Sequence, residues 1–488
     1  MDEARSVLRR LSSARGPSST PKQLDAVIKQ HVSAIGKLSQ EARAAILADP
    51  VDLLQTLDPT LNTIGYLAVL DMLRSKKVQL SAQLRDMTQE LLLKFDPCQV
   101  RYVGSMFLSL VERLGCSALF PPQVAVELLV AVMLRLDPSA SIFTSTHLVL
   151  AKLASTTGFV EPARPVLDAD ILFYPVANGA KDAKPNLCNP NLPPYAYISP
   201  STGLTEMPSS AMVLEYNVLR GMMYISRRDW ARARAALEQV VTHPMKNKGV
   251  NKLMTNSHKK WLLVGLLHQG KASRLPPYTN STAQANYQAM NEPYITLSGL
   301  YGAGQEAELR QCLETNRQTW EEDDNTSLID EVKSAYLKWQ IVNLRRIYQR
   351  LSMSELRRMT LGAENGDGPG DDQATLSLVQ GMIESGMLCG EIQTDPEGGE
   401  SYLAFGDGRS SMPETDFANE VARSQQSIER LSAQYQVVNE RLSGNRDYAR
   451  HLIREQRRVD MDKDADAAVG FETQIEDEDL MTGVMAHA

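Results

Sequence analysis

The sequence predicts a mostly α-helical protein: an array of paired helices, then a small module that adds a β-hairpin, then one long helix. Three observations predict this order. Apolar residues recur at helical spacing between short polar or proline breaks through most of the chain before residue 350. Two short strand-like runs follow one another between residues 387 and 405. Beyond them, apolar residues alternate at spacings of four and three, starting at Phe417.

These patterns divide the chain into six segments. We expect N-terminal helical repeats (1–174), a Pro-rich loop (175–210), a second set of helical repeats (211–326), a hairpin-containing module (327–408), a long helix (413–459) and an acidic disordered tail (460–488).

Composition limits the function classes. At 488 residues the chain exceeds what one compact core supports, so several domains or an extended array are expected. The net charge of −8 argues against binding to a phosphate backbone, so we expect no nucleic-acid partner. The five cysteines include no C-x-x-C pair, which is typical of a reducing compartment and favours a role as small apolar filler. The most apolar run, from Val124 to Leu134, is too short to span a bilayer, so we expect a soluble intracellular protein with no membrane partner.

The first segment repeats one theme from residue 21 to about residue 157. In "AQLRDMTQELLLKFDP", for example, Leu84, Met87, Leu91 and Leu92 share one helical face. We therefore expect a stack of antiparallel helices. The next segment, 175–210, is dense in Pro, Asn and Gly, residues that stop helices, and we expect a long loop of the kind that covers a partner.

Helices resume with a recognisable pair, "YNVLRGMMYISRRDWARARAALEQVVTHP". Gly221, Tyr224, Ala233 and Leu237 lie near the offsets of a tetratricopeptide unit. Small Gly221 and Ala233 would let the two helices approach closely, while Tyr224 and Leu237 would fill the space between them. An ordinary helical hairpin can produce a similar pattern. In either case one pair cannot bury its own faces, so neighbouring helices must stack on it.

"GLLHQGKAS", from Gly265 to Ser273, is similar to the phosphate-binding signature G-x-x-x-x-G-K-[ST]. The residue after the lysine is Ala272, which offers no hydroxyl for a magnesium ion. Pro276 and Pro277 stop the chain where a helix should begin to point its N-terminus at phosphate. We therefore interpret this stretch as the end of a buried helix with Gly270 as its C-cap, and expect no nucleotide cofactor.

After residue 327 the pattern changes to short helices and a hairpin. Leu344, Ile347, Tyr348 and Leu351 fit one helical face. A capping box at Ser352 begins the next helix, and a third helix runs from about residue 372 to a C-cap glycine.

Two strands follow the third helix, "MLCGEIQ" and "SYLAF", and three helices followed by a hairpin predict a winged helix. The third helix carries no basic residue, which favours protein contact over DNA contact. We expect a free strand edge for a partner near Tyr402, Leu403 and Phe405.

The long helix from residue 413 to about 459 carries an unbroken a/d pattern. We expect a partner interface of a helical bundle along it, carried by Phe417, Val421, Ile428, Leu431, Tyr435, Val438 and Leu442. Packing of this face on the protein's own module is the alternative. Polar Ser424 and Asn445 lie in the same face and would help to fix register.

No residue pattern predicts catalysis. The seven histidines form neither an H-x-H nor an H-x-x-x-H pair, which a zinc isopeptidase would need, so we expect no catalytic residue and no metal or other cofactor site. Spacing alone leaves a Cys/His protease open, because such partners meet only in the fold.

Helical repeats that lead into a winged helix are the plan of the PCI domain family, which is found in the proteasome lid, the COP-nine signalosome and the third eukaryotic translation initiation factor. The runs "YNVLRGMMYISRRDW", "LLVGLLHQGKASRLPPYT", "LSGLYGAGQEAELRQCLE", "YQRLSMSEL" and "MIESGMLCGEI" resemble the family of third signalosome subunits. The resemblance covers about residues 213–405, and the inserts at 180–210 and 363–372 depart from its pattern.

The resemblance implies a non-catalytic scaffold in the complex that removes the ubiquitin-like modifier Nedd-eight from the cullins of cullin-RING ubiquitin ligases. In this family, PCI winged helices pair edge to edge, carboxyl-terminal helices gather in a bundle, and the hydrolytic zinc belongs to a subunit of the MPN type. The expected partners are therefore other PCI and MPN subunits, and cullin-RING ligases beyond them, in cytoplasm and nucleus. The alternative is a PCI subunit of the proteasome lid or of a translation initiation factor complex.

Overall fold

The computed structural model describes residues 5–9, 20–75, 81–117, 119–175, 186–244, 249–360, 372–394, 401–406, 414–445, 448–454, 456 and 457. The chain divides into two compact units, residues 1–410 and 411–488, and each is described here by itself. The described residues are mostly helical, with one small sheet, as the sequence predicts. None of the described helices is long and apolar enough to cross a membrane.

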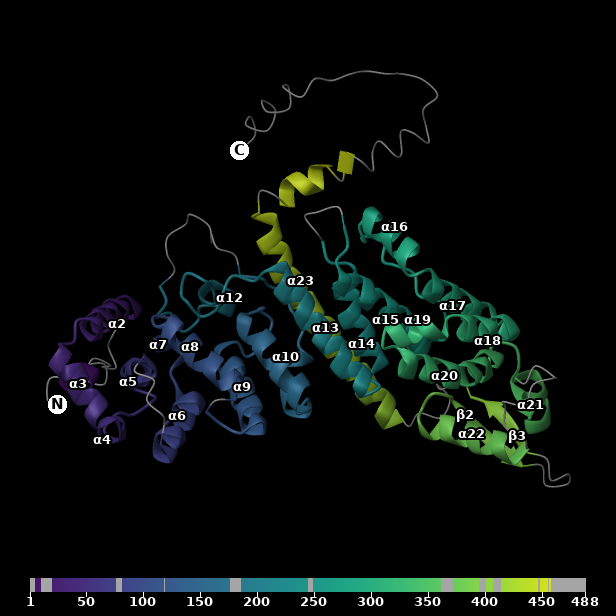
Figure 1. Cartoon of the computed structure of the whole chain (residues 1–488), viewed down its shortest axis with the longest axis horizontal. Coiled ribbons are helices and arrows are strands. Elements are labelled where there is room, and N and C mark those ends of the chain that lie inside the picture. The colour runs from purple at the N-terminus through teal and green to yellow at the C-terminus, as the bar shows by residue number, and fades with distance from the viewer. Residues whose placement is uncertain are drawn as a thin grey trace, which may run out of the picture. The chain divides into compact units, whose positions relative to one another are not determined.

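The N-terminal half of the first unit is a series of short amphipathic helices, and successive helices pack against one another (Figure 1). They run over Pro21–Gly36 (α2), Gln40–Ala48 (α3), Pro50–Gln55 (α4), Thr63–Ser75 (α5), Ala82–Lys94 (α6), Pro97–Val100 (α7), Gly104–Gly115 (α8), Pro122–Leu136 (α9), Ser145–Thr157 (α10), Glu161–Ala163 (η1, a 3-10 turn) and Arg164–Leu167 (α11).

Local chemistry explains these boundaries. The side chains of Ser39 and Ser81 accept hydrogen bonds from backbone N–H groups in the first turns of α3 and α6. The predicted inner face of α6 is confirmed, because Leu84, Leu91 and Leu92 are buried, and Met87 on the same face is half-buried.

The described part of the Pro-rich segment, residues 186–210, packs on these helices and contains one helical turn, Pro194–Tyr197 (α12). Arg101 donates hydrogen bonds to the carbonyl oxygens of Leu187 and Asn189, at 2.8 and 3.0 Å, and its guanidinium lies 3.7 Å from the centre of the Tyr197 ring. Apart from α12, residues 186–209 are irregular, as the loop prediction requires, and they pack on the protein's own helices. Sequence composition shows that helices stop here, but not that a buried arginine holds the irregular backbone in place.

The second set of helices begins with the predicted pair, Ser210–Ser226 (α13) and Trp230–Val241 (α14). A Cβ atom added at Gly221 would lie 2.8 Å from Leu237, so the close approach of the two helices requires glycine there. Ala233 and Tyr224 are also buried, as predicted.

The helix that follows, Lys252–Gln269 (α15), is continuous through the glycine-rich stretch. Gly265 is buried within it, and Gly270 adopts a left-handed φ of 64° as the C-cap. The interpretation of this stretch as a helix end is confirmed.

Further helices complete this half of the unit: Ser281–Met290 (α16), Glu292–Ala303 (α17), Glu306–Thr315 (α18), Arg317–Glu322 (α19) and Thr326–Leu344 (α20). One apolar core runs from α13 to α20 and includes the buried Trp261, Tyr287, Tyr294 and Trp320. Because each helix pair relies on the next for burial, this half behaves as a stacked array.

A small α+β module ends the first unit. It consists of Arg350–Ser352 (β1), Met353–Thr360 (α21), Asp372–Glu384 (α22), Gly390–Thr394 (β2) and Ser401–Phe405 (β3), which follow α20. The strands form an antiparallel sheet in the order β1-β3-β2. Leu403 in the central strand pairs with Leu351 of β1 on one side and with Ile392 of β2 on the other. A separate core lies between this sheet, α21 and α22. The capping interaction at Ser352 is present, because the backbone N–H of Glu355 donates to its hydroxyl at 3.2 Å.

Two predictions for this module need correction. Helix α20 ends at Leu344, and Leu351 lies in a strand rather than on a continued helical face. A three-residue strand shows too little alternation to be recognised, and Leu351 points inward in either case. Strand β3 is central, so Tyr402, Leu403 and Phe405 do not form a free edge; strand order cannot be derived from the sequence of one hairpin.

In the second unit, Glu414–Ser443 (α23) is a single helix of 30 residues. The prediction of one helix to about residue 459 is wrong, because α23 ends at Ser443, Gly444 and Asn445 are not helical, and the next described helical residues start at 448. Asn445 caps that segment rather than continuing the a/d face: the backbone N–H of Tyr448 donates to its side-chain oxygen. The predicted acidic tail, 460–488, and the insert at 363–371 lie outside the described residues.

Candidate partner interfaces

Helix α23 carries the predicted apolar stripe on its surface. None of its residues is buried. Phe417 and Tyr435 expose 61% and 70% of their surface, and Val421, Ile428 and Leu431 are exposed as well. Val438 and Leu442 are half-buried. The stripe extends over most of a helix about 45 Å long.

Other faces of the helix are polar. Arg423 pairs with Glu420, and the amide of Gln425 donates to Glu429. Burial of one Val, Leu, Ile or Phe side chain contributes roughly 1.5–3 kcal/mol. A partner that covered the stripe would therefore gain several such contributions, which makes α23 the strongest candidate interface among the described elements.

The small sheet offers a second candidate, at a different strand from the one predicted. Leu403 is fully buried and belongs to the core. Tyr402 and Phe405 are half-buried, and the guanidinium of Arg350 lies 4.3 Å from the Tyr402 ring centre. The two edge strands are β1 and β2; β2 is the longer, and its outer backbone groups face away from the sheet. Of the predicted sheet residues, none lies on that edge.

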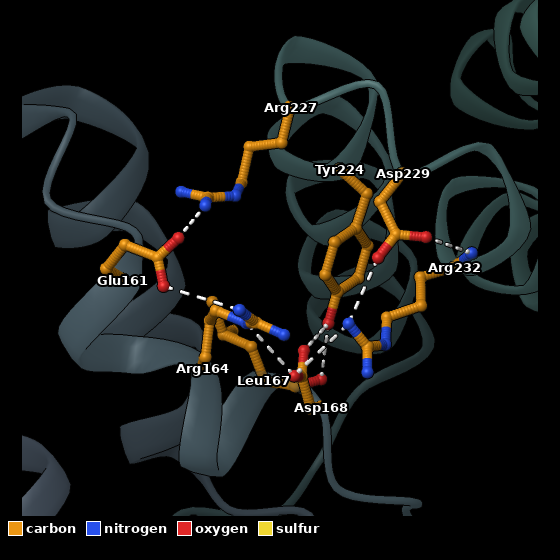
Figure 2. Close-up of polar contacts among 8 residues, drawn as sticks. All are labelled: Glu161, Arg164, Leu167, Asp168, Tyr224, Arg227, Asp229 and Arg232. Atoms are coloured by element: carbon orange, nitrogen blue, oxygen red, sulfur yellow. Dashed lines mark hydrogen bonds and ion pairs between the residues drawn. The ribbon is translucent and has the colours of Figure 1, made fainter. Parts of the chain in front are cut away.

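A polar junction joins α11 to the α13–α14 pair (Figure 2). Tyr224 projects from α13 and donates to the carboxylate of Asp168 at 2.7 Å and to the carbonyl oxygen of Leu167 at 3.0 Å. Burial raises the pKa of Tyr224, so its hydroxyl remains a donor at neutral pH.

Arginines complete this polar junction. Arg164 and Arg232 approach the Asp168 carboxylate from the two sides at 3.2 and 3.5 Å. Glu161 pairs with Arg164 and with Arg227. The sequence prediction placed Tyr224 between helices but missed its contact with Asp168 and the Asp168–Arg232 pair, because these partners lie more than fifty positions apart. The polar junction therefore links the second helical set to the first.

Two of the buried histidines, His147 and His258, are structural. Burial lowers the pKa of His258 to about 4 and that of His147 to about 3. His258 stacks on Tyr287 with ring centres 4.4 Å apart, and the side-chain amide of Asn291 donates to its Nδ1 at 2.9 Å. Both histidines are neutral at pH 7 and enclosed by protein.

The cysteines differ from one another. Cys188 is buried, and burial raises the pKa of its thiol, the opposite of what activates a nucleophile. Cys116 and Cys389 are exposed, so the prediction of apolar filler is wrong for these two. Among the described residues, no group of three His, Cys, Asp or Glu side chains could hold a metal ion.

Fold and surface together define a class: a helical-repeat protein that ends in a small antiparallel sheet and displays an apolar helix. The family model for "COP9 signalosome complex subunit 3, N-terminal helical repeats" matches residues 20–189 and 198–283. A Neurospora crassa protein named COP9 signalosome complex subunit 3 is 34% identical over 475 residues, which cover 94% of this chain and 95% of the relative. An Emericella nidulans protein of the same name is 28% identical over 345 residues, 68% and 69% of the two chains. The chain belongs to the COP9 signalosome subunit 3 family, which confirms the predicted resemblance.

Proposed function

We propose that this chain is a non-catalytic assembly subunit of the COP9 signalosome, the complex that removes Nedd-eight from cullins. Membership of the subunit 3 family supports the place in the complex. The single observation that carries the assembly role is the uncovered apolar stripe of α23, which lacks a buried residue over its 30 positions. Exposure of the apolar face of such a helix to water is unfavourable. Packing of that face against a partner helix removes the exposure.

In this proposal α23 packs into a bundle with helices of neighbouring subunits through the stripe residues. The order of helices and strands from α20 to β3 supports the winged-helix interpretation, and the outer edge of β2 is the place for a neighbour's sheet to pair. PCI and MPN subunits are the proposed partners, and cullin-RING ligases the proposed target, in cytoplasm and nucleus.

The proposal assigns hydrolysis to another subunit. His147 and His258 are neutral and buried, and Cys188 has a raised thiol pKa, so these groups are poorly suited to activate water or attack a carbonyl. Purified chain without partners should leave a neddylated cullin intact, and cleavage by it would contradict this part of the proposal.

The assembly role is tested by four substitutions in the stripe: Phe417→Ser, Val421→Ser, Ile428→Ser and Leu431→Ser. The matched control places serine at four positions on another face of the same helix: Asn419, Gln426, Arg430 and Ala433. Affinity purification of each variant from its native cells, followed by quantitative mass spectrometry, measures the recovery of the other signalosome subunits.

We expect the stripe variant to lose most of the co-purifying subunits and the control variant to retain them, because serine forfeits the apolar burial at each position. Equal recovery of the other subunits with both variants would show that assembly does not depend on the stripe of α23. Loss with both would show that serine weakens the helix itself, and the stripe would then have no special part.

A further inference from the structure

The chain is acidic overall, yet one surface segment is strongly basic. Five arginines and one glutamate lie between residues 345 and 358, in a protein whose net charge is −8. We call Arg345, Arg346, Arg350 and Arg358, together with Ile347, the arginine patch. Arg345, Arg346 and Ile347 directly follow α20, whereas Arg350 begins β1 and Arg358 lies in the last turn of α21, which packs against α20.

Hydrogen bonds fix the backbone of the arginine patch. The N–H of Arg346 donates to the carbonyl of Asn343 at 3.1 Å, and the N–H of Ile347 donates to that of Leu344 at 2.9 Å. On the far side, the N–H of Phe405 donates to the carbonyl of Gln349, which continues the pairing of β1 with β3. The patch is therefore a pre-formed surface between two anchored elements.

Ile347 directly follows Arg345 and Arg346 and is 76% exposed, more than any other large apolar side chain among the described residues. Its neighbour Tyr348 packs against the core of the α+β module, so Ile347 must project to the other side of the turn. An apolar side chain held outward between arginines offers a contact that charge alone does not provide.

The charges of the arginine patch are not neutralised by other described residues. Arg345, Arg346 and Arg358 form no ion pair within the described ranges, and Arg350 lies over the Tyr402 ring. Nearby Arg357 pairs with Asp372 at 3.4 Å, and Glu355 is the one acidic residue of the segment. Favourable interaction with the C-terminal ends of α20 and α21 explains part of this arrangement, but not the strand residue Arg350.

We propose that the arginine patch binds an acidic protein segment that carries one apolar side chain. Guanidinium groups pair with carboxylates in a planar, two-hydrogen-bond geometry, and the apolar side chain would cover Ile347. Single-stranded nucleic acid fits less well, because stacking of bases needs free aromatic rings. Tyr348 is half-buried against the core, and Arg350 lies over the Tyr402 ring. This inference does not depend on the proposed assembly role.

The full-length chain is tested with fluorescein-labelled peptides by fluorescence anisotropy. One peptide alternates Glu and Ser around a central Leu, a second has Ala in place of that Leu, and a short DNA duplex is the third probe. The test variant combines Arg345→Glu, Arg346→Glu and Arg350→Glu. Its matched control makes the same change of charge at scattered exposed sites, Lys37→Glu, Arg85→Glu and Lys252→Glu.

We expect the patch variant to weaken binding of the leucine peptide about tenfold or more, and the scattered control to weaken it less than about threefold. Ile347→Ala should weaken the leucine peptide about threefold or more and leave the alanine peptide unchanged. An Arg→Gln triple variant, checked by circular dichroism, replaces the charge-reversed one if that one unfolds.

Three results would overturn the inference. Equal losses in the patch and scattered variants would indicate diffuse attraction without a site. If the Ile347→Ala variant still bound the leucine peptide more tightly than the alanine peptide by the same factor, Ile347 would not make the proposed apolar contact. If the DNA duplex bound more tightly than the leucine peptide and this binding were lost in the patch variant, the arginine patch would be a nucleic-acid-binding surface.

Discussion

Gly270 shows how one residue determines where α15 ends. Its φ of 64° is a conformation that L-residues rarely adopt, and an added Cβ would lie 2.3 Å from the indole of Trp339. That indole cannot move freely, because its N–H donates to the carbonyl of Leu267 at 3.2 Å. Gly270→Ala should therefore lower the free energy of unfolding by roughly 2–4 kcal/mol, measured by urea denaturation.

Gly299→Ala is the matched control for this substitution. Gly299 lies on an exposed face of α17 with no atom within 4 Å of the added Cβ. Alanine there should leave stability unchanged or raise it by roughly 0.5–1 kcal/mol, because alanine is the better helix former. A loss at Gly299 equal to that at Gly270 would contradict the steric explanation.

His258 predicts a dependence of stability on pH. Its pKa is about 4 in the folded protein and about 6.5 in an unfolded chain, so the unfolded chain binds the proton first as pH falls. The stabilisation is complete above pH 6.5 and is lost as pH falls from 6.5 towards 4. At pH 5 the loss is about 2 kcal/mol for this one group.

The measurement compares urea denaturation of the native protein and His258→Gln at several pH values. The variant should be less stable at pH 7.5, because it loses the stacking on Tyr287, but its stability should fall less between pH 7 and pH 5. Parallel curves for the two proteins would show that His258 does not titrate in this range. His147 remains in both proteins and cancels from the comparison.

At the scale of elements, the polar junction links α11 to the α13–α14 pair through Asp168 and Tyr224. Tyr224→Phe should cost roughly 1–2 kcal/mol and Asp168→Ala roughly 1–3 kcal/mol of unfolding free energy. Because the two side chains share one hydrogen bond, the two costs should not add. The double variant should lose roughly 0.5–2 kcal/mol less unfolding free energy than the sum of the two single losses.

Asp330→Ala is the control for the junction substitutions, since Asp330 is exposed on α20. Its effect should stay below about 0.5 kcal/mol. Additive costs for Asp168 and Tyr224 would mean that the junction is a set of independent contacts. A large effect at Asp330 would mean that charge in general, not the junction, governs stability.

Much of the element order could be predicted from sequence, because helices here bury regularly spaced apolar residues such as Leu84 and Leu91. Features that depend on contacts between residues far apart in the chain could not be predicted from the sequence. Arg101 holds residues 187 and 189 in place from more than eighty positions away, and β1 was missed because three residues carry too little pattern. The exposed apolar face of α23 agrees with the spacing in the sequence. The free edge was assigned to β3, which is central, because one hairpin does not reveal strand order.

At the scale of the whole molecule, the first unit contains its own cores, one from α13 to α20 and one in the α+β module. Helix α23 contributes no buried residue. A chain truncated after residue 410 should therefore fold, with a thermal midpoint within about 2 °C of the full-length protein, since lost exposed surface costs little. Differential scanning fluorimetry and far-UV circular dichroism measure both properties.

The truncation and the stripe variant together separate folding from assembly. If assembly depends on α23, the truncated chain should be monomeric, stable and unable to recover the other signalosome subunits, whereas the full-length chain should recover them. Adding residues 411–488 as a separate polypeptide should compete with the full-length chain for those subunits, because the stripe alone supplies the contact. A truncated chain that unfolds would show that the second unit stabilises the first, and one that still assembles would move the interface to the first unit, where the edge of β2 is the next surface to test.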